Sequence, residues 1–267
     1  GDDRVTTNRT MIKKTFHDKG VDYASELIIQ NVVDLSKIID WNEQNNIKFF
    51  RMSSDIFPWA SEYYQDWDSV PHIDFIKMWL ENAGLKAKEY GHRITSHPGP
   101  FNVLVSPNEN VVQNTITDLT IHADIFDFMG LSRTPYNKLN IHCNGVYGDK
   151  QSAMDRFCKN FERLPESVQS RLTVENDDKA TMYSVKDLYE GIHKRIGIPI
   201  VFDYHHYKFN TGGQTEQEAL ELALSTWGDI KPVVHYSESK AEHELNESIK
   251  PQAHSDLIKE LPNTYGN

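Results

Sequence analysis

The sequence has very little cysteine and no long apolar run. Cys143 and Cys158 are the only cysteines among 267 residues, too few for a disulfide scaffold, so a reducing cytoplasmic or nuclear compartment is expected rather than secretion. Cys143 is expected to be a buried core thiol. No stretch is apolar enough to cross a bilayer, and no signal-peptide pattern is present, so a membrane partner is not expected.

Positive charge is also scarce. The 28 basic residues are outnumbered by 39 acidic ones, which gives a formal net charge of −11. Taken alone, this balance argues against a nucleic-acid partner, which usually binds a basic face. Net charge averages over the whole surface, however, and bound divalent cations reverse the sign locally. The charge therefore disfavours nucleic-acid binding only where no metal site is present.

Short apolar segments of strand length alternate with amphipathic segments of helical spacing. The predicted strands are 47–52, 93–96, 138–142, 172–175, 198–203 and 232–235. The predicted helices are 22–44, 71–91, 111–129, 151–163, 184–195 and 215–227, with a short helix after His254 and loops over 1–21 and 236–251. Such alternation predicts parallel strands joined by right-handed crossovers. No low-complexity linker interrupts the chain, so one domain over 1–267 is expected.

Metal-binding side chains stand at the carboxyl ends of five predicted strands. They are His97, His142, Glu175, Asp203 and His235, and His206 and His254 extend the set. A doubly wound sheet gathers its site from a few strands at one switch point, whereas a TIM barrel gathers it from many strand ends around one rim. Five contributing strand ends therefore favour an α/β fold of the TIM (β/α)8-barrel type.

A single histidine at a strand end is more often a hydrogen-bonded structural residue than a ligand. Agreement among five strand ends favours the ligand interpretation. His206 is preferred over its neighbour His205, although spacing alone does not decide between them. The remaining histidines are interpreted as surface residues: His17, His72, His92, His122, His193 and His243.

Imidazole and carboxylate ligands together suit Zn²⁺, Mn²⁺ or Fe²⁺ better than Ca²⁺. Seven ligands exceed the capacity of one tetrahedral ion, so two or three ions are expected, with Glu175 bridging a pair. Clustered divalent ions clamp both oxygens of a phosphodiester displacement and generate hydroxide near neutral pH. Sugar isomerase-like chemistry also uses metals, usually with fewer histidines, and remains an alternative.

Several blocks resemble the UV damage endonuclease family, in order along nearly the whole chain. They are Thr7-Asn8-Arg9-Thr10, Phe50-Arg51-Met52-Ser53-Ser54, His97-Pro98-Gly99, His142 with Gly145 to Lys150, Glu175-Asn176-Asp177, Phe202 to His206, and His235-Tyr236-Ser237. The resemblance implies a TIM barrel related to endonuclease IV. It implies a metal cluster, with manganese expected first and zinc or magnesium as alternatives. It also implies incision of damaged double-stranded DNA immediately 5′ of UV photoproducts, leaving a 3′ hydroxyl, by a protein expected to be a monomer.

The same resemblance distributes the ligands over three ions. It assigns His97, His142 and Glu175 to one ion, Glu175, Asp203 and His235 to a second, and His206 and His254 to a third. Glu175 is the expected catalytic residue. Asp55 and Asn176 are expected beside the ligands rather than on the metal.

DNA-probing residues follow His97 in this family, at positions that correspond to Pro100 and Phe101 here. An apolar wedge is physically reasonable because opening a duplex costs least at a poorly stacked lesion. The alternative is that Phe101 folds back onto the rim. Asn8 and Lys150 are further expected DNA contacts, Lys150 at a helix start where phosphate is favoured.

The chain departs from the family pattern at several points. Family members have a strand before the Thr-Asn-Arg-Thr block and a final strand bearing a Glu ligand, so the barrel is expected to lack its first and last strands or to be trimmed there. Val233 stands where some members have lysine, Asp55 where some have histidine, and Pro100 replaces a polar residue. The absent C-terminal Glu ligand and Val233 motivate a third alternative, a catalytically inactive protein that binds damaged DNA.

Overall fold

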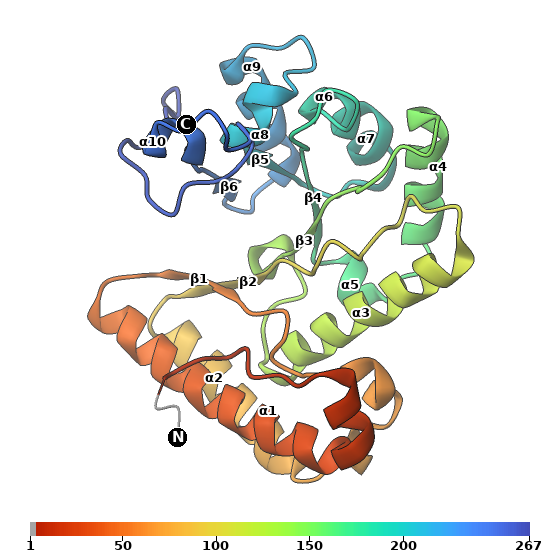
Figure 1. Ribbon diagram of the computed structural model, residues 1–267, viewed down its shortest axis with the longest axis vertical. Helices are drawn as coiled ribbons and strands as arrows, with labels where there is room; N and C mark the ends of the chain where they lie inside the picture. The colour runs from red at the N-terminus through yellow and green to blue at the C-terminus, as the bar shows by residue number, and fades with distance from the viewer. Residues whose placement is uncertain (1–3) are drawn as a thin grey trace. The chain divides into compact units, whose positions relative to one another are not determined.

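The computed structural model describes residues 4–267, which form two compact units (Figure 1). The first unit contains the residues up to 99, 116–139 and 164–171, and the second contains 100–115, 140–163 and 172–267. Residues 1–3 of the predicted N-terminal loop lie outside the described residues. The expectation of one domain over 1–267 stays a prediction.

Helices and strands alternate along the described chain. The strands are β1 Phe49–Met52, β2 Arg93–Ser96, β3 Leu139–Ile141, β4 Leu172–Glu175, β5 Ile200–Asp203 and β6 Val234–His235. The helices are α1 Lys13–Gln44, α2 Ile73–Glu89, α3 Glu109–Phe128, α4 Lys150–Phe161, α5 Glu166–Gln169, α6 Val185–Leu188, α7 Lys194–Ile196, α8 Tyr204–Phe209, α9 Glu216–Leu224 and α10 Lys240–Glu244. Within residues 4–267, none of these helices has the length and apolar character needed to span a bilayer.

The strands pair in parallel within each unit. In the first unit β1 pairs with β2 in parallel, with Phe49 opposite Arg93. In the second unit β5 pairs with β6 in parallel, with Asp203 opposite His235. The predicted α/β fold with a parallel sheet is confirmed, and parallel pairing directs the carboxyl ends of neighbouring strands to the same edge.

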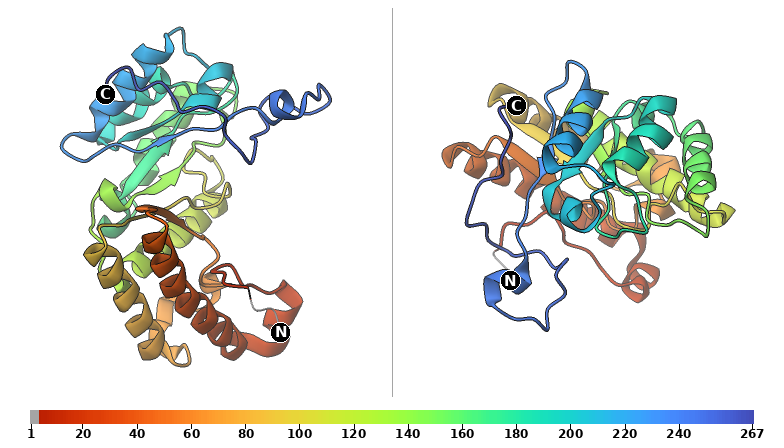
Figure 2. Two further views of the ribbon diagram at one scale, coloured as in Figure 1. Left: turned by 90° about the vertical axis from the view of Figure 1, so that its left-hand side faces the viewer. Right: turned by 90° about the horizontal axis from the view of Figure 1, so that it is seen from above.

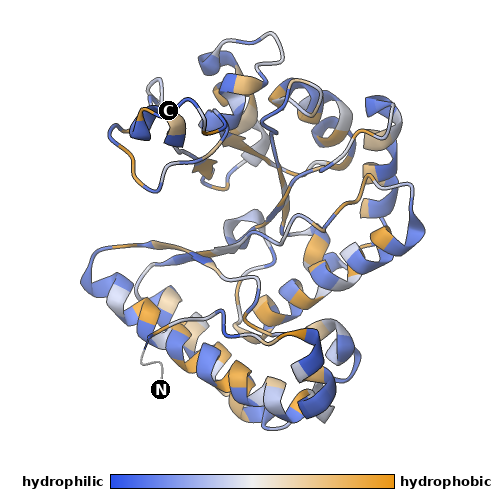
Figure 3. Cartoon of the chain, viewed as in Figure 1, coloured by the Kyte–Doolittle hydropathy of each residue, from blue (hydrophilic) through white to orange (hydrophobic). Residues whose placement is uncertain are grey.

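The core of the first unit lies between α1 and α2, which run side by side (Figure 2). Apolar and polar residues alternate along both helices in the hydropathy colouring of Figure 3, as expected for helices with one buried stripe. The stripe includes fully buried side chains of Ile28, Val32, Leu35, Ile39, Ile76 and Leu80.

Helix α1 begins at Lys13, earlier than the predicted start at Asp22. Its first part lacks an apolar period and is separated from the rest by a kink at Gly20, where φ is 67°. The Phe16 ring stacks on Trp59 with centroids 5.6 Å apart. The early start was missed because a distant aromatic contact, rather than local periodicity, packs this turn.

Two histidines that were predicted to lie on the surface are buried in the first unit. His92 and His122 are each 5% exposed. His92 Nε2 lies 2.7 Å from Glu43 Oε2, and His122 Nδ1 lies 2.7 Å from the Asp118 carbonyl oxygen. Both are hydrogen-bonded structural residues, so the surface assignment was wrong for them.

Replacing Gly84 with alanine is expected to destabilise the first unit. A Cβ atom at Gly84 would lie 1.8 Å from the carbonyl oxygen of Met129, so α2 must shift away. Overpacking of this kind costs about 1–3 kcal/mol. Urea unfolding of Gly84→Ala should show this loss, whereas Lys88→Ala on the same helix should change the free energy of unfolding by less than about 0.5 kcal/mol. Equal stabilities for the two variants would contradict this packing.

The core of the second unit is formed by β4 and β5 with α6 and α9. Its buried apolar side chains include Val174, Ile200, Val201, Phe202, Leu188, Leu220 and Ala223. The helix predicted after His254 is absent from the described chain, and α10 instead lies within the predicted 236–251 loop. The amides of Lys259 and Glu260 bind the Glu238 carboxylate rather than helical carbonyl groups.

Candidate metal centre

Glu175 is the carboxylate on which the second unit's polar side chains converge. It ends β4 and is 1% exposed. Its Oε1 lies 2.9 Å from His235 Nδ1, and its Oε2 lies 3.3 Å from His142 Nε2. Asn140 donates to Oε2 at 2.7 Å from β3. Three strand ends, β3, β4 and β6, thus place polar atoms around one buried carboxylate.

Asp203 and His206 form the other side of this cluster. One ligand atom each from Glu175, Asp203 and His206 lies within 4.8 Å of the others. Asp203 ends β5 and caps α8, and its Oδ1 accepts the His206 backbone amide at 2.8 Å. The chain turns into a helix directly after Asp203. That turn brings His206 toward Glu175 and leaves His205 on another side.

Asn176 fixes the backbone of Asp203. Asn176 is fully buried. Its Oδ1 accepts the Asp203 amide at 2.8 Å, and its Nδ2 donates to the Asp203 carbonyl oxygen at 3.1 Å. The Asn176 carbonyl oxygen also lies 2.8 Å from His206 Nδ1. Hydrogen bonds of this kind orient ligands and set the histidine tautomer.

His142 is oriented by Asp177, a residue that sequence reasoning did not assign. Asp177 Oδ1 lies 2.9 Å from His142 Nδ1, which directs Nε2 toward Glu175. Asn140 was also missed, and its Oδ1 accepts the Thr173 hydroxyl at 2.8 Å. The sequence signal for Asn140 was its place within a predicted apolar strand. A buried polar side chain there requires hydrogen-bond partners.

His254 reaches the cluster from the segment after β6. Its ring centroid lies 5.4 Å from that of His206 and 5.0 Å from that of His205. His205 Nε2 lies 3.2 Å from the Gln252 carbonyl oxygen. His205 therefore supports the backbone next to His254, whereas His206 belongs to the carboxylate cluster.

The pKa of each ionisable group in the cluster depends strongly on the charges of its neighbours. Burial disfavours ionisation of Glu175, but the charges of His235 and His142 outweigh it and hold the pKa of Glu175 well below its usual range. Burial and then the Glu175 charge raise the pKa of Asp203 to about 7. Burial opposes protonation of His142, yet the charges and hydrogen bonds of Glu175 and Asp177 raise its pKa to about 10. Buried carboxylates here require positive charge from protons or cations.

The donor set fits a divalent transition metal. Two buried carboxylates and several imidazoles within a few ångströms of one another match the ligand preferences of Zn²⁺, Mn²⁺ and Fe²⁺. The need for compensating positive charge supports the same fit, because a metal ion replaces the protons that histidines otherwise hold.

The first unit contains His97 and Asn8, which line one pocket of about 410 Å³. His97 directly follows β2. The Thr7-Asn8-Arg9-Thr10 block is anchored to α1, because Arg9 pairs with Asp34 at 2.7 Å and its amide donates to Asn31 Oδ1 at 3.0 Å. The rest of the polar lining is formed by Thr6, Thr7, Arg51, Ser53 and Ser54.

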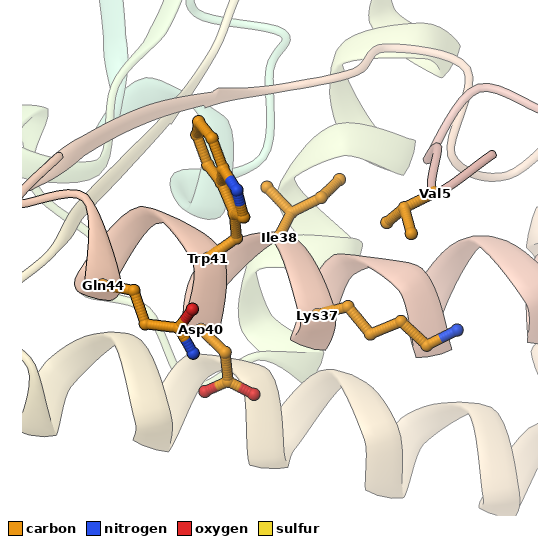
Figure 4. A pocket seen from close by; sticks show the side chains of 6 residues that line it. All are labelled: Val5, Lys37, Ile38, Asp40, Trp41 and Gln44. Atoms are coloured by element: carbon orange, nitrogen blue, oxygen red, sulfur yellow. The ribbon is translucent and has the colours of Figure 1, made fainter.

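A second pocket of the first unit, of about 610 Å³, contains none of the predicted site residues (Figure 4). Figure 4 shows Ile38 and Trp41 projecting from α1, with Val5 of the N-terminal segment beside them. Trp41 is 57% exposed. Pocket size therefore does not identify the functional residues of this unit.

Phe101 points into solvent and is 86% exposed, so the alternative of a ring folded back onto the rim is wrong. The backbone beneath it is held, because Asn144 Nδ2 donates to the Pro100 carbonyl oxygen at 3.2 Å and the Val103 amide donates to Thr115 Oγ1 at 2.9 Å. Pro100 is also exposed. This loop presents an apolar side chain from a tethered backbone.

Two other predicted residues, Lys150 and Asp55, and the departure Val233 have well-defined surroundings. Lys150 begins α4 and pairs with Asp187 at 2.9 Å. Asp55 is exposed, and its amide donates to Ser53 Oγ at 3.2 Å. Val233 is buried against Val201 and Trp227, so an apolar cluster occupies that position. The roles of Lys150 and Asp55 stay predictions. Cys143 is fully buried, as expected.

These observations define a parallel α/β protein with a buried histidine–carboxylate cluster at the carboxyl ends of its strands. The family model described as UV-endonuclease UvdE matches residues 3–267. The chain belongs to the UV-endonuclease UvdE family.

Relatives and solved structures agree with this assignment. The chain is 37% identical over 270 residues to a UV-damage endonuclease of Schizosaccharomyces pombe, an alignment that covers 97% of this chain and 44% of that protein. It is 33% identical to a UV DNA damage endonuclease of Bacillus cereus (strain G9842), covering 93% of this chain and 79% of that protein. The chain thus spans less than half of the first relative and most of the second.

The crystal structure of SacUVDE is similar with a TM-score of 0.83 and 33% identity, covering 95% of this chain and 81% of that one. A D-psicose 3-epimerase from Clostridium cellulolyticum H10 is similar with a TM-score of 0.51 and 12% identity, covering 76% of this chain and 67% of that one. At that identity the likeness concerns the fold alone.

Proposed function

We propose that this protein is a metal-dependent DNA-repair endonuclease that incises the backbone immediately 5′ of UV photoproducts and other distorting lesions, leaving a 3′ hydroxyl. The observation that carries the proposal is the convergence of His142, His206 and His235 on buried Glu175. Family membership supports damaged double-stranded DNA as the substrate.

In this mechanism the chain's residues build a site for a phosphate group. Bound divalent cations would supply Lewis acidity and neutralise charge that develops on the phosphate oxygens. Glu175 would bridge two cations, since its two oxygens face His235 and His142 respectively. Asp203, held by Asn176, would bind the second of these two cations. His206 and His254 would hold a third cation.

His97, in the first unit, is a further proposed metal ligand. The support is its place directly after β2, where a parallel strand directs the following residue to the same edge as its neighbours. Asn8 and Lys150 are proposed contacts to the DNA backbone, and Asp55 is proposed to support the ligands.

The direct test is incubation of the protein with Mn²⁺ and a duplex that carries one pyrimidine photoproduct. A nick on the 5′ side of the lesion, lost on chelation of the metal, is the expected result. An intact folded sample that makes no nick would refute the proposal. Tight metal-independent binding without a nick would select a damage-binding protein, and ketose–aldose interconversion would select sugar chemistry.

Replacing Phe101 with alanine is expected to weaken discrimination between damaged and intact duplexes by about 10-fold, because a stacking side chain contributes roughly 1–3 kcal/mol per base. Competition binding with matched damaged and undamaged duplexes measures this ratio. Phe75→Ala removes another exposed phenylalanine, 44% exposed on α2, and should leave the ratio unchanged. If Phe101→Ala leaves the ratio of affinities for damaged and undamaged duplexes unaltered, Phe101 does not act as a stacking wedge.

A further inference from the structure

The segment that follows β6 carries His254 and projects from the rest of the second unit with α10 at its far part (Figure 2). Within this segment Ser239 and His254 form an antiparallel bridge. The Lys240 amide donates to the Ala253 carbonyl oxygen at 2.8 Å, and the Ser255 amide donates to the Glu238 carbonyl oxygen at 2.8 Å. The backbone on both sides of His254 is therefore paired with the residues 238–240.

The carboxylate of Glu238 contacts four polar groups of this segment. Its Oε1 accepts the amides of Lys259 and Glu260 at 2.8 and 3.0 Å and the Tyr236 hydroxyl at 3.2 Å. Its Oε2 contacts His243 Nε2. His243 Nδ1 in turn lies 3.1 Å from Ser255 Oγ, next to His254.

We propose that Glu238 is a positioning residue that holds His254 beside His206. This inference rests on the proposed metal site and extends it to a residue with no place among the predicted ligands. Glu238 lies three residues after His235, so one short stretch fixes His235 by strand pairing and His254 by hydrogen bonding.

The energetics favour this role. Hydrogen bonds to an ionised acceptor are about twice as strong as neutral ones. The Glu260 amide and the His243 imidazole lower the pKa of Glu238 to about 2, so the acceptor is ionised at neutral pH. The segment has no regular structure beyond the five-residue helix α10 and its bridge. Without this carboxylate, the entropy of a loose loop would oppose the placement of His254.

The experiment compares Glu238→Ala, Glu238→Gln and His254→Ala with the wild-type chain. Calorimetric titration with Mn²⁺ gives the dissociation constant of the most weakly bound ion. Hydrogen exchange gives the exchange rates of the backbone amides of Ser255, Lys259 and Glu260. Loss of a residue that orients a ligand typically weakens metal binding 10- to 100-fold. We expect that weakening in Glu238→Ala, together with faster exchange of the three amides.

Glu238→Gln keeps one oxygen for the two amides, so its Mn²⁺ affinity should fall between wild type and Glu238→Ala. The double variant Glu238→Ala/His254→Ala should bind Mn²⁺ no more weakly than His254→Ala, since both changes remove the same ligand. Glu247→Gln removes a carboxylate that is exposed in the same segment, and it should match wild type in both measurements.

Unchanged Mn²⁺ affinity in Glu238→Ala, or additive losses of Mn²⁺ affinity in the double variant, would overturn the positioning role of Glu238 and leave the proposed nuclease function standing. Failure of the wild type to incise damaged DNA, with metal affinity lost as expected in the variants, would overturn the nuclease function and leave the positioning role standing. No Mn²⁺ binding by the wild type would overturn both. If Glu238→Ala does not fold, the glutamine variant decides by the same criteria.

Discussion

Replacing Glu175 with glutamine is expected to lower the rate of incision by at least about 10³-fold while the fold survives. The glutamine keeps the shape of the side chain but loses the negative charge that His235, at 2.9 Å, and His142, at 3.3 Å, share. A neutral amide cannot bridge two cations, so the charge that develops on the phosphate is left without compensation. A 10³-fold loss corresponds to about 4 kcal/mol of transition-state stabilisation.

Three measurements separate this effect from unfolding. Single-turnover incision gives the chemical rate, circular dichroism gives the fold, and elemental analysis after dialysis gives the bound metal. Glu162→Gln removes an exposed carboxylate of the second unit and should incise at the wild-type rate. Turnover of Glu175→Gln at the wild-type rate would refute the bridging role, whatever its metal content.

The strand ends of the candidate site were predictable because the local sequence indicates both where a buried strand ends and which polar residue stands there. A short apolar run followed by a polar residue indicates where a buried strand stops, and parallel order sends successive stops to one edge. His142, Glu175, Asp203 and His235 satisfy this rule, and the structure places all four at the carboxyl ends of their strands in the second unit. No knowledge of side-chain packing was needed for that step.

The supporting residues were not predictable because their partners depend on register and on distant segments. Asn176 reaches the backbone of Asp203 only because β4 and β5 pair with Glu175 opposite Val201. The choice of His206 over His205 depends on α8 beginning immediately at Tyr204. Glu238 binds amides more than 20 positions away. None of these contacts leaves a periodic signal in the sequence.

The carboxylates and histidines of the second unit also predict how pH acts on the metal-free protein. His142 has a pKa raised from 6.5 to about 10 in the folded state. Between those values the folded chain holds a proton that the unfolded chain has released, so stability falls as pH rises across this window. Asp203, raised from 3.8 to about 7, acts with the same sign at lower pH. Metal-stripped protein should therefore lose roughly 2–4 kcal/mol between pH 6.5 and 10 through His142.

Divalent metal should reverse this loss, because a cation replaces the proton and becomes a stronger competitor as pH rises. Free Mn²⁺ at about 100 times its dissociation constant should add about 2.7 kcal/mol to the free energy of unfolding. The gain in melting temperature should be larger at pH 9 than at pH 6.5. Thermal unfolding with chelator or with Mn²⁺, under inert gas, measures both effects. His142→Ala should flatten the pH dependence of the chelated protein, whereas His17→Ala, which removes an exposed histidine, should preserve it. A metal gain that is independent of pH would mean that protons and cations do not compete for these ligands, and the cluster around Glu175 would then be a structural network rather than a metal centre.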